Sequence, residues 1–298
     1  MPDFFAESSH LWLIFSLLTA LAVASQDAWV KKFFSHLSSF EMSAFPLIFS
    51  LPLFCLGLFF ITVPPLNGTF LWSFLVSIPL NAVAFLLYMA AIRQSPLSLT
   101  LPYLAFTPVF MIATGLLFLD EMPNSYGIAG IMSICIGSYV LNLEPGKYSF
   151  LAPIKAVFEV TGSWIMLIVA FLFSFAAVIG KVAIVNSSPV FFSMAFFGTF
   201  DLFTIIILLA ARKITITTFV KNPAKGIIAG CLLFFHALFH AWAISMTKAA
   251  YMISVKRLSI LFGIIYGGLL FREKNLLIRF TGASLMVSGA VIIIIKGS

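Results

Sequence analysis

Apolar residues occur along this chain in long continuous runs that short polar breaks separate. Ten runs approach or exceed the roughly 20 residues that a helix needs to cross the hydrocarbon core of a bilayer. They cover residues 11–31, 41–62, 70–92, 97–119, 125–143, 161–182, 189–211, 226–248, 249–271 and 275–295. The runs do not alternate between polar and apolar positions as membrane β-strands do. The pattern therefore predicts an all-α integral membrane protein with ten transmembrane helices.

The composition agrees with a lipid environment. Of the 298 residues, 62% are hydrophobic and 9% are charged, whereas a soluble domain carries about 25% charged residues. This disfavours soluble enzymes and nucleic-acid-binding modules. We therefore expect the net charge of +7 to report loops and orientation and not a nucleic-acid partner. The bilayer is the expected partner, and the composition does not indicate an oligomeric state.

An internal repeat divides the chain. Residues 90–142 align with residues 242–294 at a constant offset of 152 and without a gap, so that Gly130 falls on Gly282. We expect such paired glycines to permit close contact between helices. Each copy holds five spans, an odd number, so the second copy must enter the membrane from the opposite side. The repeat predicts two inverted five-helix units around a central cavity, a common architecture of secondary transporters.

The repeated residues also carry a family resemblance. They are the stretch 104–110 with Gly115, Glu121, Gly130 and Gly137, and the stretch 257–262 with Gly267, Glu273, Gly282 and Gly289. Both copies resemble the EamA domain, and together they resemble the ten-helix members of the drug/metabolite transporter superfamily. The resemblance implies a first EamA-like repeat over residues 1–143, a connecting segment over 144–160 and a second EamA-like repeat over 161–298.

Two adjacent cations inside the ninth run are the first candidate site. Lys256 and Arg257 lie seven and eight residues into it, about 10–12 Å along a helix, where a charge costs at least ~2.5–3.5 kcal/mol. A guanidinium offers a planar fork for carboxylate or phosphate, and an ammonium adds a point charge. A similar pair in sugar-phosphate and nucleotide-sugar transporters of the superfamily contacts anionic groups. We predict an anionic or zwitterionic substrate; the alternative is that the pair snorkels to the interface.

Two carboxylates lie inside other runs. Asp27, beside Gln26, is near the end of the first run, and Asp201 is about twelve residues into the seventh. Either carboxylate is a candidate to bind a cationic group or to couple transport to a proton. The alternatives are that Asp27 faces water and that Asp201 forms a salt bridge with Lys256 or Arg257.

Further polar and aromatic candidates complete the predicted site. His236 and His240 are one helical turn apart and share a face; we favour helix packing for them, with a substrate or proton role as the alternative. No third ligand is near, so we expect no metal. Five more residues are candidates to line the cavity: Asn81, Tyr88, Tyr103, Trp242 and Tyr266.

Other residues have expected structural roles. Glu121 and Glu273 end equivalent spans, where a carboxylate can accept hydrogen bonds from the free N–H groups that begin the next helix. Pro102 and Pro108 remove backbone hydrogen bonds and are expected to kink the fourth span. The ninth span, 249–271, contains no proline, so the two halves need not bend alike.

The distribution of Lys and Arg bears on orientation. Of 17 such residues, 12 lie on the side of the loops that follow the first, third, fifth, seventh and ninth spans, and 3 lie on the opposite side. The positive-inside rule then places both termini outside. The family resemblance implies both termini in the cytoplasm.

The functional prediction is a secondary transporter of a bacterial inner membrane. It would move a small polar metabolite, anionic or zwitterionic and such as an amino acid, by alternating access, as uptake, efflux or exchange. No nucleotide-binding loop, G-x-S-x-G or H-E-x-x-H motif occurs, so we predict neither an ATP-driven pump nor an enzyme, and no cofactor. The alternatives are an exchanger of phosphorylated metabolites, a channel, a membrane enzyme or a scaffold.

Overall fold

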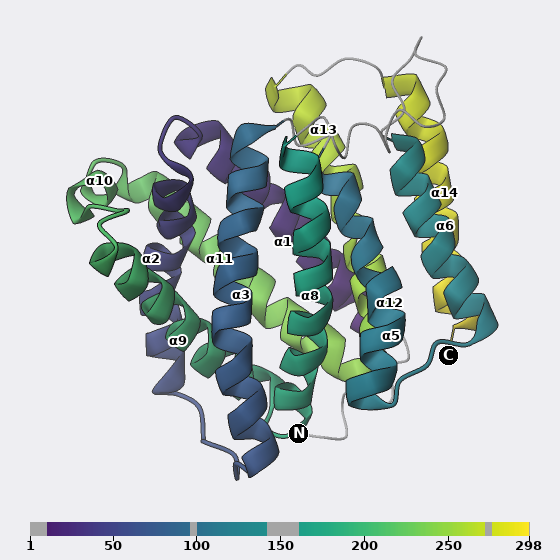
Figure 1. The fold of residues 1–298 in the computed structure, drawn as a ribbon, viewed down its shortest axis with the longest axis horizontal. Helices are drawn as coiled ribbons and strands as arrows, with labels where there is room; N and C mark the ends of the chain where they lie inside the picture. The colour runs from purple at the N-terminus through teal and green to yellow at the C-terminus, as the bar shows by residue number, and fades with distance from the viewer. Residues whose placement is uncertain (1–10, 96–99, 142–160, 272–275, 298) are drawn as a thin grey trace.

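Helices that run side by side form almost all of the structure (Figure 1). It is a computed structural model that describes residues 11–95, 100–141, 161–271 and 276–297. The helices before the connecting segment are α1 (Leu11–Phe34), α2 (Ser39–Leu58), α3 (Gly68–Gln94), the 3₁₀ helix η1 (Leu101–Phe106), α5 (Thr107–Leu119) and α6 (Ser125–Leu141). Those after it are α8 (Thr161–Val185), α9 (Pro189–Ala210), α10 (Ile216–Val220), α11 (Pro223–Met246), α12 (Ala249–Lys256), α13 (Ser259–Phe271) and α14 (Leu276–Lys296).

The predicted all-α membrane fold is confirmed. Within the described residues, eight helical segments are long and apolar enough to cross a membrane, with η1–α5 and α12–α13 each counted as one. Ser125–Leu141 and Thr281–Lys296 are apolar but shorter. Each of the ten predicted spans therefore has a helical counterpart, and a total of ten membrane crossings stays a prediction.

Local sequence signals explain where several helices begin. Ser38 caps α2 and forms a capping box with Glu41, in which each side chain satisfies a backbone N–H that the helix leaves free. Asn67 caps α3 by accepting a hydrogen bond from the amide of Phe70, and Ser188 caps α9 by accepting one from the amide of Phe191. Polar residues in the breaks between apolar runs thus set the register of the helices that carry the site.

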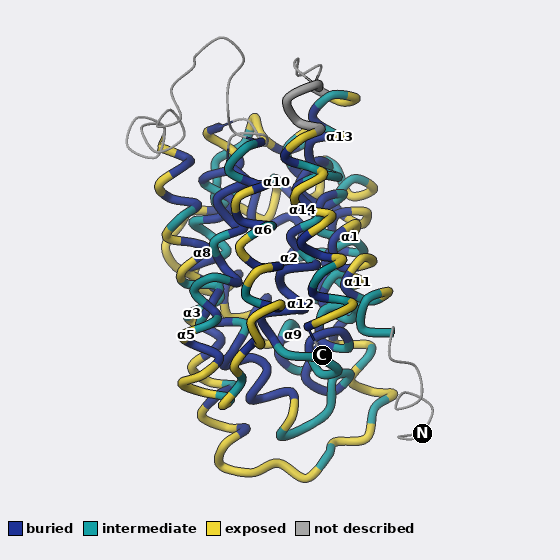
Figure 2. Tube along the Cα trace, turned by 90° about the vertical axis from the view of Figure 1, so that its right-hand side faces the viewer, coloured by how far each residue is buried: buried dark blue, intermediate teal, exposed yellow. Residues whose placement is uncertain are grey.

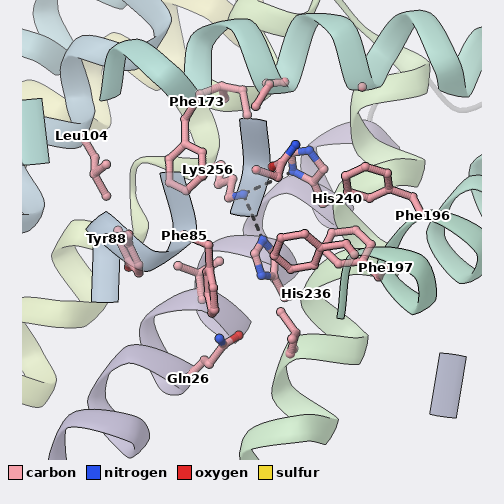
Figure 3. A pocket seen from close by; sticks show the side chains of 18 of the residues that line it. Gln26, Phe85, Tyr88, Leu104, Phe173, Phe196, Phe197, His236, His240 and Lys256 are labelled. Atoms are coloured by element: carbon pink, nitrogen blue, oxygen red, sulfur yellow. Dashed lines mark hydrogen bonds between the residues drawn. The ribbon is translucent and has the colours of Figure 1, made fainter. Parts of the chain in front are cut away.

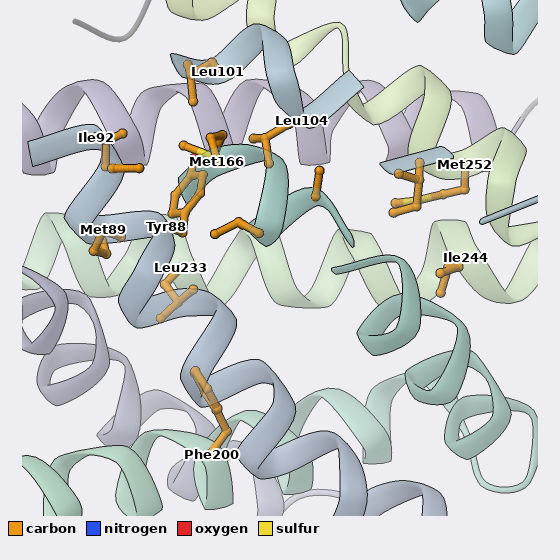
Figure 4. Packing of buried hydrophobic residues seen from close by; sticks show 14 of the residues in the cluster. Tyr88, Met89, Ile92, Leu101, Leu104, Met166, Phe200, Leu233, Ile244 and Met252 are labelled. Carbon is orange, nitrogen blue, oxygen red and sulfur yellow. The ribbon is translucent and has the colours of Figure 1, made fainter. Parts of the chain in front are cut away.

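Helices from the two halves of the chain alternate in space. Helix α3 packs on α8, α1 packs on α11, and α6 packs on α14, so that each of these pairs joins one helix from each half. One apolar core cluster draws side chains from both halves (Figure 4). Buried residues lie mainly between the helices, and exposed ones follow the outer edges and the ends (Figure 2).

Paired glycines allow α6 and α14 to approach closely, as the sequence predicts. A Cβ atom on Gly137 would lie 2.6 Å from the carbonyl oxygen of Gly282, and one on Gly289 would lie 2.6 Å from that of Gly130. Both distances are shorter than real Cβ contacts. The contact is reciprocal between the two halves, and the division into two inverted repeats, with its boundaries, stays a prediction.

The fourth and ninth spans both break, at equivalent points of the repeat. The fourth changes from η1 to α5 between Phe106 and Thr107, as the two prolines predict. The ninth breaks between α12 and α13 at Arg257–Leu258, where the amide of Ile260 bonds the carbonyl of Arg257 three residues back, at 3.0 Å. The sequence left open whether the two halves bend alike, and the structure breaks the helix in both spans. A 3₁₀-type turn within a helix often marks a hinge, and it needs no proline.

Glu121 caps a helix start, but a different one from that expected. Its carboxylate accepts from the amide of Ala249, at 2.8 Å, which begins α12 and not the next helix α6. It also forms an ion pair with Lys181 on α8. Lys181 in turn donates to the carbonyl of Thr247, at 2.6 Å. Glu121 thus ties three helices together at one end of the molecule; its predicted counterpart, Glu273, lies outside the described residues.

Candidate functional site

A cavity of about 140 Å³ lies among helices of both halves. This is about tenfold the roughly 10–15 Å³ that one enclosed water requires by the same measure. Residues of α1, η1, α3, α8, α9, α11 and α12 line it, together with Arg257 at the break before α13. Eight of the twelve predicted site residues are in its lining: Gln26, Asp27, Asn81, Tyr88, His236, His240, Lys256 and Arg257.

Arg257 lies at the point where the two broken spans meet. Its side chain is 4% exposed, and its Nη2 donates to the hydroxyl of Thr107, at 2.8 Å, across the break in the fourth span. Its Nε has no partner among the described residues. The side chain is therefore buried in the protein and does not snorkel, and its guanidinium is held at one nitrogen while another donor remains free to bind.

Lys256 is held by the two histidines of α11. Its ammonium contacts Nε2 of His236 at 3.0 Å and Nδ1 of His240 at 3.3 Å (Figure 3). A lysine ammonium has only donors, so each imidazole presents its unprotonated nitrogen. The shared face that the i,i+4 spacing predicts is thus directed at the lysine, and the histidines position this cation at the cavity.

Asp27 is the carboxylate of the cavity. It is 2% exposed, so the alternative that it faces water is wrong, and it accepts a hydrogen bond from the hydroxyl of Tyr88. The neighbouring Gln26 is also buried, and its Oε1 has no partner among the described residues. Two cations and one carboxylate thus line the cavity, and its described charges favour a ligand with one net negative charge.

Phenylalanine side chains form much of the remaining wall, and none of them was predicted as a site residue. Six phenylalanines from α3, α8 and α9 line the cavity: Phe85, Phe173, Phe192, Phe196, Phe197 and Phe200. In Figure 3 several of these rings lie beside the two histidines and Lys256. With 35 phenylalanines spread over the chain, no local signal separates these six from those that face lipid.

Four predicted site residues are outside the cavity lining. Tyr103 is buried within η1. Trp242 packs on the ring of Phe15, with 5.2 Å between centroids. The hydroxyl of Tyr266 hydrogen-bonds that of Ser25 at 2.8 Å and so joins α13 to α1. These three aromatic residues hold helices together and do not border the cavity.

Asp201 is the fourth residue outside the lining. Its Oδ2 accepts from the hydroxyl of Ser50 at 2.6 Å, between α9 and α2. The salt bridge to Lys256 or Arg257, which was the alternative for Asp201, does not form: Asp201 contacts Ser50, and the adjacent residue Phe200 lines the cavity. Because Asp201 is a single polar residue in an apolar run, the sequence does not indicate which face of α9 its carboxylate occupies.

Comparisons with known proteins relate part of this chain to a family and its whole length to a known fold. Residues 10–143 match the model of the EamA-like transporter family. One crystal structure, described only as that of a protein, shares the fold with a TM-score of 0.66 over 93% of this chain and 97% of its own, at 13% identity. No curated protein matches the chain in sequence. Residues 10–143 are therefore similar to the EamA-like transporter family, and the whole chain is a multi-pass membrane protein.

Proposed function

We propose that this protein is a secondary transporter for a small metabolite that carries one carboxylate and an apolar body, an anion or a zwitterion. The cavity carries this proposal: Arg257 and Lys256 offer donors on one side, and phenylalanine rings cover another. The guanidinium and the ammonium bind the carboxylate. Asp27 accepts a substrate ammonium when the substrate has one, and the rings enclose the apolar part.

Alternating access is supported by the position of the two breaks. They lie in equivalent spans of the predicted repeat, and Arg257 joins them through Thr107. Discontinuous helices at the contact between repeats are a recurrent site of substrate binding in secondary transporters. A substrate carboxylate that engages Arg257 pulls directly on both hinges. Substrate binding and the change of conformation are thereby linked.

A matched set of compounds tests the substrate class by thermal shift of the purified protein, since a ligand that binds the folded state raises its apparent stability. L-Phenylalanine and 3-phenylpropionate both carry a carboxylate and a ring, and we expect both to raise the Tm. 2-Phenylethylamine lacks the carboxylate, so we expect it to leave the Tm unchanged. L-Alanine lacks the ring, so we expect it to raise the Tm less than L-phenylalanine does. Stabilisation by 2-phenylethylamine alone would contradict the proposal.

Two further measurements, binding of phenyl phosphate and counterflow, distinguish a carboxylate carrier from a phosphate exchanger, a channel and a scaffold. A larger shift with phenyl phosphate than with 3-phenylpropionate would favour an exchanger of phosphorylated metabolites, because the planar fork of Arg257 also suits phosphate. The stabilising compound is then tested for counterflow in proteoliposomes. A carrier gives saturable counterflow, whereas a channel passes the compound without saturation and a scaffold does not pass it.

A further inference from the structure

Asp201 is a buried carboxylate that the proposed substrate site does not use. It lies near the middle of α9, is 0% exposed and is on the side of the helix that contacts α2. A charged group at such a depth costs several kcal/mol on insertion scales, so it requires a partner or a function. The cavity is adjacent, because Phe200 lines it, but Asp201 is separate from it.

The contacts of this carboxyl group are few. Ser50 donates to Oδ2 at 2.6 Å, and the same hydroxyl is 3.2 Å from the carbonyl of Leu47. Oδ1 has no hydrogen-bond partner among the described residues, and neither has Oγ1 of Thr204, one turn along α9. A buried carboxylate in the ionised form would need two or three donors to replace water. This one has a single hydroxyl.

The charged groups on neighbouring helices are engaged elsewhere. Helix α9 packs against α2, α3, α8 and α11. Each described charged or imidazole side chain on these helices has another partner. Glu41 contacts Ser38 and Thr218, Arg93 contacts Leu37, Lys181 contacts Glu121, Lys225 contacts Phe33, and His236 and His240 contact Lys256. The other described titratable side chains of these helices are Cys55, Tyr88 and Cys231. In this part of the chain, Ser50 is the group that interacts with the Asp201 carboxyl.

We propose that Asp201 is a proton-binding site, occupied by a proton in this conformation, and that it couples the transporter to the proton gradient. A proton fits the contacts because it neutralises the carboxylate and needs no further ligand. A metal cation such as Na⁺ is disfavoured, since among the described residues the hydroxyl of Ser50 is the one oxygen found in contact with the carboxyl group. Hard cations require about six oxygen ligands.

Helix α9 links this proton to the cavity. Its Phe196, Phe197 and Phe200 line the cavity, while Asp201 packs against α2. A movement of α9 that opens the cavity also separates Asp201 from α2 and admits water. Hydration then stabilises the carboxylate, and the proton is released to the side that the cavity faces. This coupling rests on the proposed transport function, whereas proton binding does not.

Infrared spectroscopy of the purified protein tests the proton site without any substrate. A protonated carboxylic acid has a C=O stretching band that is separate from those of carboxylates. We expect wild-type protein at neutral pH to show such a band and Asp201→Asn to lose it, while Asp120→Asn, at an exposed position, keeps it. Persistence of the full band in Asp201→Asn would overturn the proposal.

A second variant keeps the spectroscopic test decisive if Asp201→Asn does not fold. Ser50→Ala removes the hydroxyl that donates to Oδ2. The C=O band is then expected to shift to higher frequency, because its oxygen loses a hydrogen bond. An unshifted band in Ser50→Ala would show that the protonated group is not Asp201.

Transport in proteoliposomes tests the coupling, with radiolabelled L-phenylalanine as the probe. We expect Asp201→Asn to retain counterflow, which needs no net proton movement, and to lose accumulation driven by a pH gradient; Asp120→Asn should retain both. Accumulation equal to wild type in Asp201→Asn would overturn the coupling. If wild-type protein shows neither activity, the proposed transport of this probe fails, and the infrared band still decides whether Asp201 holds a proton.

Discussion

At the scale of single residues, polar groups inside apolar runs identify much of the site. Lys256, Arg257 and Asp27 are conspicuous because a charge at depth in a span is costly, and all three line the cavity. The same reasoning selects Asp201, which packs between α2 and α9 and not in the cavity. The position of a charged residue within an apolar run indicates the energetic cost of burying it. The face of the helix on which its side chain lies depends on the packing of neighbouring helices, which the run does not indicate.

Arg257→Lys tests the role of the guanidinium. Lysine keeps the charge but loses the planar fork and the contact with Thr107. Loss of one charge-assisted hydrogen bond to a buried group costs about 1.5–3 kcal/mol, so we expect 3-phenylpropionate to bind roughly 10- to 100-fold more weakly, measured by titration in a thermal-shift assay. Lys221→Ala, at an exposed position, is the control. If Arg257→Lys binds 3-phenylpropionate with unchanged affinity, the guanidinium of Arg257 does not bind the carboxylate.

At the scale of elements, periodicity and turn residues predict the helices well and their breaks less well. The fourth span bends at the prolines that predict it, but the ninth bends at Arg257–Leu258 without any proline. The second break lies against the first, because α12 packs on α5 and Arg257 reaches Thr107. Helix contacts also explain the glycines of α6 and α14, which the repeat marks in the sequence.

Gly137→Ala tests the close contact between α6 and α14. The new Cβ would lie 2.6 Å from the carbonyl oxygen of Gly282, a backbone atom that cannot move aside alone. Overpacking of this kind costs about 1–3 kcal/mol, so we expect a lower Tm for the purified protein. Gly268→Ala is the matched control, since among the described residues no atom outside its own stretch of helix lies within 4 Å of its added Cβ. Equal Tm values for the two variants would contradict the close contact.

At the scale of the whole molecule, charge predicts orientation. Lys213, in the loop between α9 and α10, is at the opposite end from the start of α3 at Gly68 (Figure 1). Asn67 and Asn186 join the loops at that second end, with a hydrogen bond of 2.8 Å. Since the predicted spans put 12 of the 17 Lys and Arg on the side of Lys213, the positive-inside rule predicts that this end lies in the cytoplasm.

Single cysteines test this orientation in a variant without Cys55, Cys135 and Cys231. We expect a membrane-impermeant thiol reagent applied to intact cells to modify Gly68→Cys and not Lys213→Cys. Both cysteines should react after the membrane is permeabilised, which controls for exposure. The opposite labelling pattern would favour termini in the cytoplasm, as the family resemblance implies.

The sequence by itself determines that this chain is a bundle of membrane helices with buried charges, because lipid admits only segments that satisfy their own backbone hydrogen bonds. The lengths of these helices, the residues at which they begin and the polar residues buried in them can all be predicted from nearby residues in the sequence. Only the tertiary structure decides which polar groups meet. Tyr88 reaches Asp27 across 61 positions, Arg257 reaches Thr107 across 150, and Ser50 reaches Asp201 across 151. Such pairs form because packing turns particular helix faces towards each other, and an apolar run is equally hydrophobic on every face.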